Sequence, residues 1–172
     1  MIPSGLSGIR VFGLLAAASA WGAAPVLRIE GIAGRDGISK PAVEFSIEDL
    51  RAMPRVTVLV RTGNDQHKFE GVDVAELLKR AGQPQGAEVR GPILSRLILI
   101  TAHDGYRAVF SLPELDPAFT DTQPVLADRM DGADLPVRDG PLRLVLPKEK
   151  RESRWIRMVE RIEIRSLPEP VR

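Results

Sequence analysis

The chain has 172 residues, with 24 lysines and arginines against 23 aspartates and glutamates, and 44% of its residues are hydrophobic. This length allows one domain with a sizeable core. Because cysteine is absent, the sequence excludes disulfides, iron–sulfur clusters, zinc–cysteine sites and a cysteine nucleophile. Two histidines, His67 and His103, are too few for a three-histidine metal site. A formal net charge of +1 gives no field that would favour nucleic acid as a partner.

The N-terminus has the pattern of an export signal. Residues 1–10 contain one basic residue and no acid, and residues 11–20 form a short apolar run that is followed by small residues. This order is typical of a signal peptide with an A-x-A cleavage site. The run is too short to span a bilayer comfortably. We therefore expect residues 1–23 to be a signal peptide and the mature protein to be periplasmic or secreted, with no membrane span.

The segment after the signal predicts a strand and a loop over residues 24–43, followed by the main domain over residues 44–167. The loop is expected at residues 31–41, which hold three glycines, an aspartate and a proline. Ser46 is expected to begin a short helix, because Asp49 follows it three residues later as in a capping box.

Residues 55–61 are rich in β-branched side chains and predict a strand, and residues 62–68 predict a polar turn. The clearest helix follows. Asp73 is its expected N-cap, apolar residues recur at i, i+3, i+4 and i+7 from Val74, and Gly82 is expected to end it.

The second half of the chain predicts mainly strands. Residues 97–102 form a continuous apolar run, the pattern of a strand buried on both faces. Further strands are expected at residues 106–111, 124–130 and 142–146, with a helical turn at 112–115. Residues 155–164 close the chain and supply core candidates, namely Ile156, Met158, Ile162 and Ile164. Strands outnumber short, scattered helices, so the sequence predicts a single α+β domain with a mixed or mainly antiparallel sheet.

Four segments in this order resemble the molybdopterin-binding oxidoreductase domain of the sulfite oxidase and nitrate reductase family. They are F-E-G-V-D-V-A-E-L-L-K-R-A-G (residues 69–82), H-D-G-Y (103–106), V-L-A-D-R-M-D-G-A-D-L-P-V-R-D-G-P-L-R-L-V-L-P (125–147) and R-W-I-R-M-V-E-R-I-E-I (154–164). The resemblance implies the sulfite oxidase-like molybdopterin-binding fold and molybdopterin as the cofactor.

One motif of that family is altered. Active members bind molybdenum through a cysteine in a C-x-G-N-like turn, and Arg61, Thr62, Gly63 and Asn64 stand in its place. A guanidinium group is always protonated and has no lone pair for a metal. The resemblance therefore implies a short, stand-alone member without Cys-ligated molybdenum and without a metal ligand from this turn.

Two groups of residues are candidates for binding a cofactor or another anion. Arg61, Thr62, Gly63 and Asn64 form either an ordinary polar turn or a remnant pterin pocket that binds an anion. The resemblance also places the basic segments around 129–138 and 148–154 on the cofactor side. Their fork-shaped or point-charge donors would suit an oxyanion, although a solvated loop is the alternative. These basic candidates are Arg129, Arg138, Lys148 and Arg154.

The catalytic candidates are His103, Asp104 and Tyr106. A carboxylate beside His103 would make its imidazole a proton carrier, and the alternative is a solvated turn. Tyr106 is the only tyrosine, and it would place its hydroxyl at the pocket edge or serve packing alone.

Three functions stay open at this point. The first is an exported ligand-binding, redox-accessory or sensor domain with a small anionic or pterin-like ligand and a membrane sensor or redox protein as partner. The second is a molybdopterin-dependent oxidoreductase whose metal is held by the cofactor alone. The third is a protein–protein interaction scaffold with a closed pocket.

Overall fold

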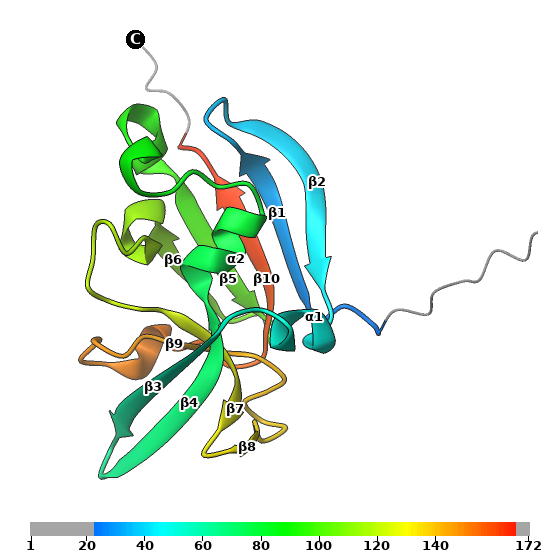
Figure 1. The fold of residues 1–172 in the computed structure, drawn as a ribbon, viewed down its shortest axis with the longest axis vertical. Helices are drawn as coiled ribbons and strands as arrows, with labels where there is room; N and C mark the ends of the chain where they lie inside the picture. Colours follow the sequence, from blue (N-terminus) through cyan, green and yellow to red (C-terminus); the bar gives the residue numbers. More distant parts are fainter. Residues whose placement is uncertain (1–22, 168–172) are drawn as a thin grey trace, which may run out of the picture.

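Two β-sheets supply most of the regular secondary structure in the computed structural model, which describes residues 23–167 (Figure 1). The first sheet contains, in spatial order, β2 (Ile38–Phe45), β1 (Leu27–Ala33), β10 (Val159–Arg165), β5 (Leu97–Ala102) and β6 (Arg107–Ser111). The second contains β3 (Arg55–Thr62), β4 (Asp65–Asp73), β7 (Val125–Met130) and β8 (Ala133–Asp134), with β9 (Arg143–Val145) also paired to β7. Among these pairs only β1 and β10 run parallel. The predicted α+β class with mixed, mainly antiparallel pairing is confirmed.

The helices are short, as expected, and the predicted caps are present. Helix α1 (Ile47–Arg51) begins at Ser46, whose hydroxyl accepts from the Asp49 backbone N–H at 3.1 Å while the Asp49 carboxylate accepts from the Ser46 N–H at 2.8 Å. Helix α2 (Val74–Arg80) begins at Asp73, whose carboxylate accepts from the Ala75 N–H at 2.8 Å. The remaining helical turns are 3₁₀: η1 (Gly86–Glu88), η2 (Gly91–Ser95), η3 (Leu112–Leu115) and η4 (Glu152–Arg154).

Two predicted loops are wrong, because most of their residues lie in strands. Residues 31–41 contribute the end of β1 and the start of β2, and only residues 34–37 form the turn between them. Gly31 belongs in β1 because β10 approaches it closely: a Cβ there would lie 2.1 Å from the Ile164 carbonyl oxygen. The polar turn predicted at 62–68 shrinks to residues 63–64, since polar side chains on an exposed strand face look like a turn in sequence.

Strand β5 differs from its prediction in burial. Ile98, Ile100 and Ala102 are buried, whereas the alternate residues, Leu97, Leu99 and Thr101, are only half-buried. The strand therefore packs one face on the core and turns the other outward, as antiparallel sheets commonly do.

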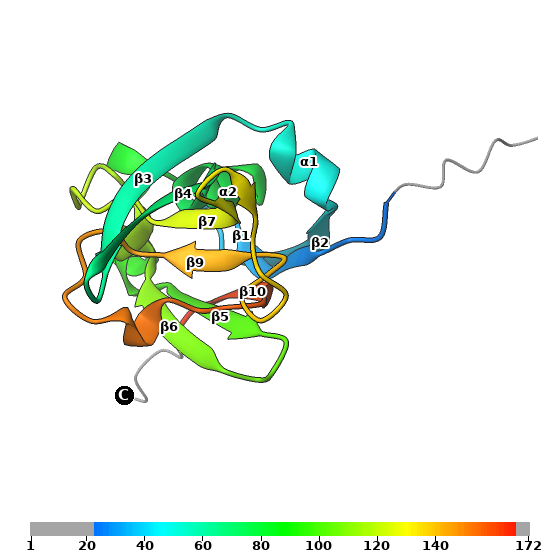
Figure 2. The same ribbon diagram turned by 90° about the horizontal axis from the view of Figure 1, so that it is seen from below.

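One hydrophobic cluster fills the space between the two sheets and α2, whose Val74, Leu77 and Leu78 are fully buried. Figure 2 shows β7 and β9 of the second sheet lying across from β5, β6 and β10 of the first. Two backbone hydrogen bonds join β9 and the residue before it to the segment that leads into β10: Leu144 N–H to Ile156 O at 2.8 Å and Val159 N–H to Leu142 O at 2.9 Å. The site described below lies at this junction.

The predicted signal peptide lies, apart from Ala23, outside the described residues. Within residues 23–167, none of the helices is both long and apolar enough to cross a membrane.

Candidate functional site

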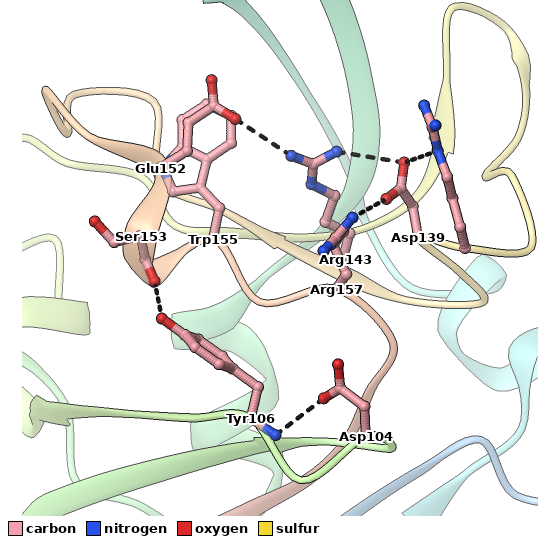
Figure 3. Close-up of a pocket in the computed structure, with 9 residues that line it drawn as sticks. Asp104, Tyr106, Asp139, Arg143, Glu152, Ser153, Trp155 and Arg157 are labelled. Carbon is pink, nitrogen blue, oxygen red and sulfur yellow. Dashed lines mark hydrogen bonds and ion pairs between the residues drawn. The ribbon is translucent and has the colours of Figure 1, made fainter.

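A cavity of about 500 Å³ opens beside the junction of the two sheets, and we call it the arginine cleft (Figure 3). Its walls come from the turn between β5 and β6, the loop between β8 and β9, strand β9 itself, and the segment from η4 to β10. It is lined by Asp104, Tyr106, Arg138, Asp139, Arg143, Glu152, Ser153, Trp155 and Arg157.

Arg143 lies at the centre of the cleft, with only 11% of its side chain exposed. Its guanidinium carbon is 5.4 Å from the centroid of the Phe69 ring and 5.8 Å from that of Trp155, within the range of cation–π attraction. Burial lowers the pKa of Arg143 from its ordinary value, while the nearby carboxylates of Asp139 and Glu152 raise it. The group stays charged, because arginine is not deprotonated in proteins at ordinary pH.

Asp139 holds three guanidinium groups around one buried carboxylate. Its oxygens lie 3.6 Å from Arg143 Nη1, 3.7 Å from Arg157 Nη1 and 3.9 Å from Arg138 Nε. Hydrogen bonds from guanidinium groups to carboxylates are shorter than these three distances. The arginine N–H groups therefore remain available to donate hydrogen bonds to a ligand. Glu152 lies 3.5 Å from Arg143 Nη2. With Asp104 also in the lining, three arginines and three carboxylates line the cleft, which has no net formal charge.

Two buried donors in this part of the protein have no hydrogen-bond partner among the described residues. They are Arg143 Nε and the indole Nε1 of Trp155. Most buried polar groups are satisfied, and an exception needs an explanation such as an absent ligand, ion or water. Both atoms are shielded from solvent, so a ligand in the cleft would instead meet the Nη groups of Arg143 and the more exposed Arg138 and Arg157, whose ion pairs are long. These groups suit the cleft to an anionic ligand.

Tyr106 joins the two sides of the cleft. Its hydroxyl donates to the carbonyl oxygen of Ser153 at 2.5 Å, and its backbone N–H donates to the Asp104 carboxylate at 2.9 Å. Figure 3 shows the phenol ring reaching from the β5–β6 turn toward η4. Tyr106 therefore fixes the position of η4 relative to the first sheet.

The structure brings three of the sequence-predicted site residues together in the cleft, namely Asp104, Tyr106 and Arg138. His103 is absent from the lining of the cleft: its side chain is 80% exposed and its Nδ1 lies 3.0 Å from Glu160. The exposed Arg61 lies near the end of β3, and the exposed Gly63 and Asn64 form the turn after Thr62, so this motif is also outside the cleft lining.

The other predicted basic residues lie elsewhere. Lys148 and Arg154 line a neighbouring pocket of about 420 Å³ on the other side of η4, where Arg154 is paired with Glu114 and Glu149. Arg129, on β7, donates to the Gly132 carbonyl oxygen, and its Nε is buried without a partner among the described residues.

Sequence reasoning does not find the central residues of the cleft, Asp139, Arg143, Glu152 and Arg157. Asp139 and Arg143 lie within the D-G-P-L-R stretch of the third resembling segment, which is the signal that would have found them. The approach of Arg143 to Phe69 and Trp155 depends on tertiary contacts between β4, β9 and the η4–β10 segment, which local patterns do not encode.

Comparison with known proteins supports one family. The family model described as "Oxidoreductase molybdopterin binding domain" matches residues 27–171. Among solved structures, the fold is similar to the crystal structure of the sulfane dehydrogenase SoxCD from Paracoccus pantotrophus, with a TM-score of 0.60 and 22% identity. The match covers 80% of this chain but only 37% of that one. No curated protein matches the chain in sequence.

The residues of the cleft fit the phosphate of molybdopterin, but they supply no ligand set for its metal. The three arginines of the cleft suit its phosphate. The 172 residues include no cysteine to ligate a metal, and residues 23–167 contain no cluster of three or more histidine, aspartate or glutamate side chains that would hold one.

Proposed function

This chain belongs to the family of oxidoreductase molybdopterin-binding domains, and from that premise we propose that its arginine cleft binds an anionic, pterin-like ligand without a bond from a protein thiolate. It would act as a ligand-binding, redox-accessory or sensor domain. The observation that carries the proposal is Arg143, a nearly buried cation whose ion pairs among the described residues, to Asp139 and Glu152, are both long.

Electrostatics supports an anion in this position. A charge removed from water is costly unless it is paired and hydrogen-bonded, and the contacts of Arg143 to Asp139 and Glu152 are 3.5 Å or longer. An oxyanion that accepts from a guanidinium fork makes shorter, charge-assisted bonds. The exposed Arg138 and Arg157, which line the same cleft, supply further donors.

Thermal unfolding with added inorganic phosphate, sulfate or a phosphate-bearing pterin tests the proposal. We expect the ligand to raise the melting temperature of the wild-type chain, because binding to the folded state alone stabilises it. Arg143→Met keeps most of the side-chain volume but loses the charge, so its affinity should fall about tenfold or more, as for loss of a charged hydrogen bond.

Arg61→Met is the matched control, since it removes an equally basic side chain at an exposed position outside the cleft lining. It should leave the shift in melting temperature unchanged. The proposal is wrong if none of the three ligands shifts the wild-type melting temperature, or if Arg143→Met responds as the wild type does.

A molybdopterin-dependent oxidoreductase is the second candidate, favoured by the family match over residues 27–171. When bound, the cofactor would supply metal-centred electron transfer. The cleft arginines would hold its phosphate, and Tyr106 would keep η4 in place at the cleft mouth. Metal analysis of protein purified from its native exporting cell tests this candidate: stoichiometric molybdenum supports it, and protein free of molybdenum and pterin contradicts it.

Export and partners complete the proposal. The N-terminal pattern supports secretion to the periplasm or beyond, and sequencing of the mature N-terminus should find it near Trp21 or Ala24. An intact Met1 on cytosolic protein would contradict export. An accessory or sensor role would require a partner protein in the membrane or a soluble redox partner, whereas the open cleft gives no support to a scaffold with a closed pocket.

A further inference from the structure

A ligand can reach only one edge of the Arg143 guanidinium group, because its Nε is shielded from solvent. The rings of Phe69 and Trp155 contact its guanidinium group, and Nη1 faces the buried Asp139. Nη2 faces Glu152 at 3.5 Å, as Figure 3 shows. A ligand that pairs with Arg143 therefore meets the Glu152 carboxylate first.

The two carboxylates beside Arg143 are held very differently. The Asp139 side chain is 6% exposed and lies among three arginines, and its backbone carbonyl accepts from the Met158 N–H at 3.0 Å. The Glu152 side chain is 39% exposed, and within the described residues its carboxylate has one ion pair, to Arg143. Glu152 can regain water when it leaves, because part of its side chain is exposed, whereas withdrawing one member of a buried cluster costs several kcal/mol in general. Glu152 is the carboxylate that can leave.

The backbone around Glu152 is anchored without help from its carboxylate. The Ser153 carbonyl accepts from the Tyr106 hydroxyl at 2.5 Å, and the Trp155 N–H donates to the Glu152 carbonyl at 2.9 Å. Arg154 is paired with Glu114 at 3.2 Å and also with Glu149. The Glu152 side chain can therefore swing into solvent while η4 keeps its position.

We propose that Glu152 is a tethered competitor for the ligand: its carboxylate occupies the Nη2 edge of Arg143 until an oxyanion displaces it. This inference rests on the proposed anion-binding function. It names the ligand group as a compact oxyanion, because a carboxylate already fits this edge. Arg138 and Arg157 favour a group with more than one negative charge. Glu152 thereby sets the threshold concentration at which the cleft fills.

Trp155 is a natural reporter of this exchange, because its ring contacts Arg143 and lines the cleft. The chain has two tryptophans, so the test uses the full-length protein with Trp21→Phe in every variant. Inorganic phosphate, sulfate and acetate are titrated separately against Trp155 emission. The acetate series distinguishes a preference for tetrahedral oxyanions from one for any carboxylate.

Glu152→Gln should bind phosphate about three- to fivefold more tightly than the parent, because the variant no longer has a charged carboxylate that competes for Arg143, and a partly exposed ion pair contributes about that factor. Glu149→Gln is the matched control: it makes the same change in the same charged segment, but Glu149 pairs with Arg154 and lines the neighbouring pocket. Its affinity should change less than twofold.

The outcomes distinguish this inference from the function on which it rests. If the parent binds an anion and Glu152→Gln binds it no more tightly, the tethered-competitor inference is wrong and the anion site remains. If neither the parent nor Glu152→Gln binds any of the three anions, the proposed function fails and the inference fails with it. Tighter binding by both Glu152→Gln and Glu149→Gln would show a general charge effect and would also overturn the role of Glu152.

Discussion

At the scale of single residues, Gly71 shows why one position of the F-E-G-V segment must be glycine. Strand β4 pairs with β7 there, and the register shifts between Glu70 and Gly71. A Cβ on Gly71 would lie 2.1 Å from the Leu126 carbonyl oxygen and 2.5 Å from the Ala127 Cα, both backbone atoms. Neither atom can rotate away, so the two strands pair at this distance only because the side chain is absent.

Gly71→Ala is therefore expected to destabilise the fold by roughly 2–3 kcal/mol, the upper range for overpacking a tight site. Urea unfolding followed by circular dichroism measures the change. Gly63→Ala is the control: Gly63 has a φ of +62°, but a Cβ at this position would have no neighbouring atom within 4 Å. It should cost only about 1 kcal/mol, from backbone strain alone. Equal losses in the two variants would contradict the close-approach explanation.

Sequence reasoning finds some residues of the cleft but not its centre. Asp104 and Tyr106 follow a turn signal, and Arg138 belongs to a basic segment, so all three can be selected locally. Arg143 acquires its role from Phe69, a residue of β4, and from Trp155, beyond η4. Such contacts are decided by strand pairing and packing, and a single sequence gives no direct signal for them.

At the scale of elements, capping residues make the helix starts predictable. Ser46 with Asp49 and Ser111 with Glu114 each form a reciprocal capping box. A hydroxyl followed by an acid three residues later satisfies two backbone N–H groups within four residues. Because the interaction is entirely local, it is visible in sequence, and the first of these boxes is among the confirmed predictions.

The Asp49 carboxylate should make stability depend on pH. Hydrogen bonds from the Ser46 hydroxyl and backbone N–H lower the pKa of Asp49 below its usual value of 3.8. A group with a lowered folded-state pKa stabilises the fold above its unfolded-state pKa, and this contribution disappears as the pH falls through the folded-state value. The stability difference between the wild type and Asp49→Asn should therefore shrink as the pH falls from about 6 to about 3.

Denaturant unfolding at several pH values measures that difference in stability. The same Asp49→Asn substitution is also made in a chain that already contains Ser46→Ala. Removing the hydroxyl eliminates the larger cause of the pKa shift and leaves the backbone hydrogen bond. The pH-dependent part of the Asp49→Asn effect should be smaller there. A difference that grows toward low pH in the wild-type background would refute the assignment.

Strand boundaries are harder to predict than helix starts. Residues 31–41 and 62–68 contain turn-forming residues, yet β1, β2 and β4 extend through most of them. Their polar side chains lie at exposed positions of paired strands. The neighbouring strand supplies their backbone hydrogen bonds, and the local sequence gives no sign of that pairing. Tertiary pairing overrides local propensity in such segments.

At the scale of the whole molecule, a buried carboxylate ties the N-terminal part of the domain to the second sheet. The Asp128 side chain on β7 is 1% exposed and pairs with Arg51 of α1 at 2.7 Å and with Arg55 of β3. Arg51 also pairs with the exposed Asp134 at 2.6 Å. These contacts join segments more than 70 residues apart in the chain.

Asp128→Asn should lower the free energy of unfolding by about 2 kcal/mol. This is less than the cost of breaking a fully buried pair, because the two arginines left behind are partly exposed and can gain water. Asp134→Asn is the matched control, since its carboxylate is 72% exposed. Its effect should stay within about 1 kcal/mol, as for surface ion pairs. Urea unfolding of both variants measures these free energies. A similarly small loss of unfolding free energy in each variant would mean that Asp128 contributes no more than a surface ion pair.

The amino-acid sequence was enough to establish the composition limits, the capped helices, most of the strands and, through four ordered segments, the family. These features depend on local spacing or on motifs that keep their order in the chain. Tertiary packing was needed to show that two sheets meet beside β9, that Arg143 lies against the rings of Phe69 and Trp155, and that the Arg61 turn is outside the cleft lining. The absence of cysteine is a property of the chain, whereas the arginine cleft exists only once strands distant in sequence are packed together.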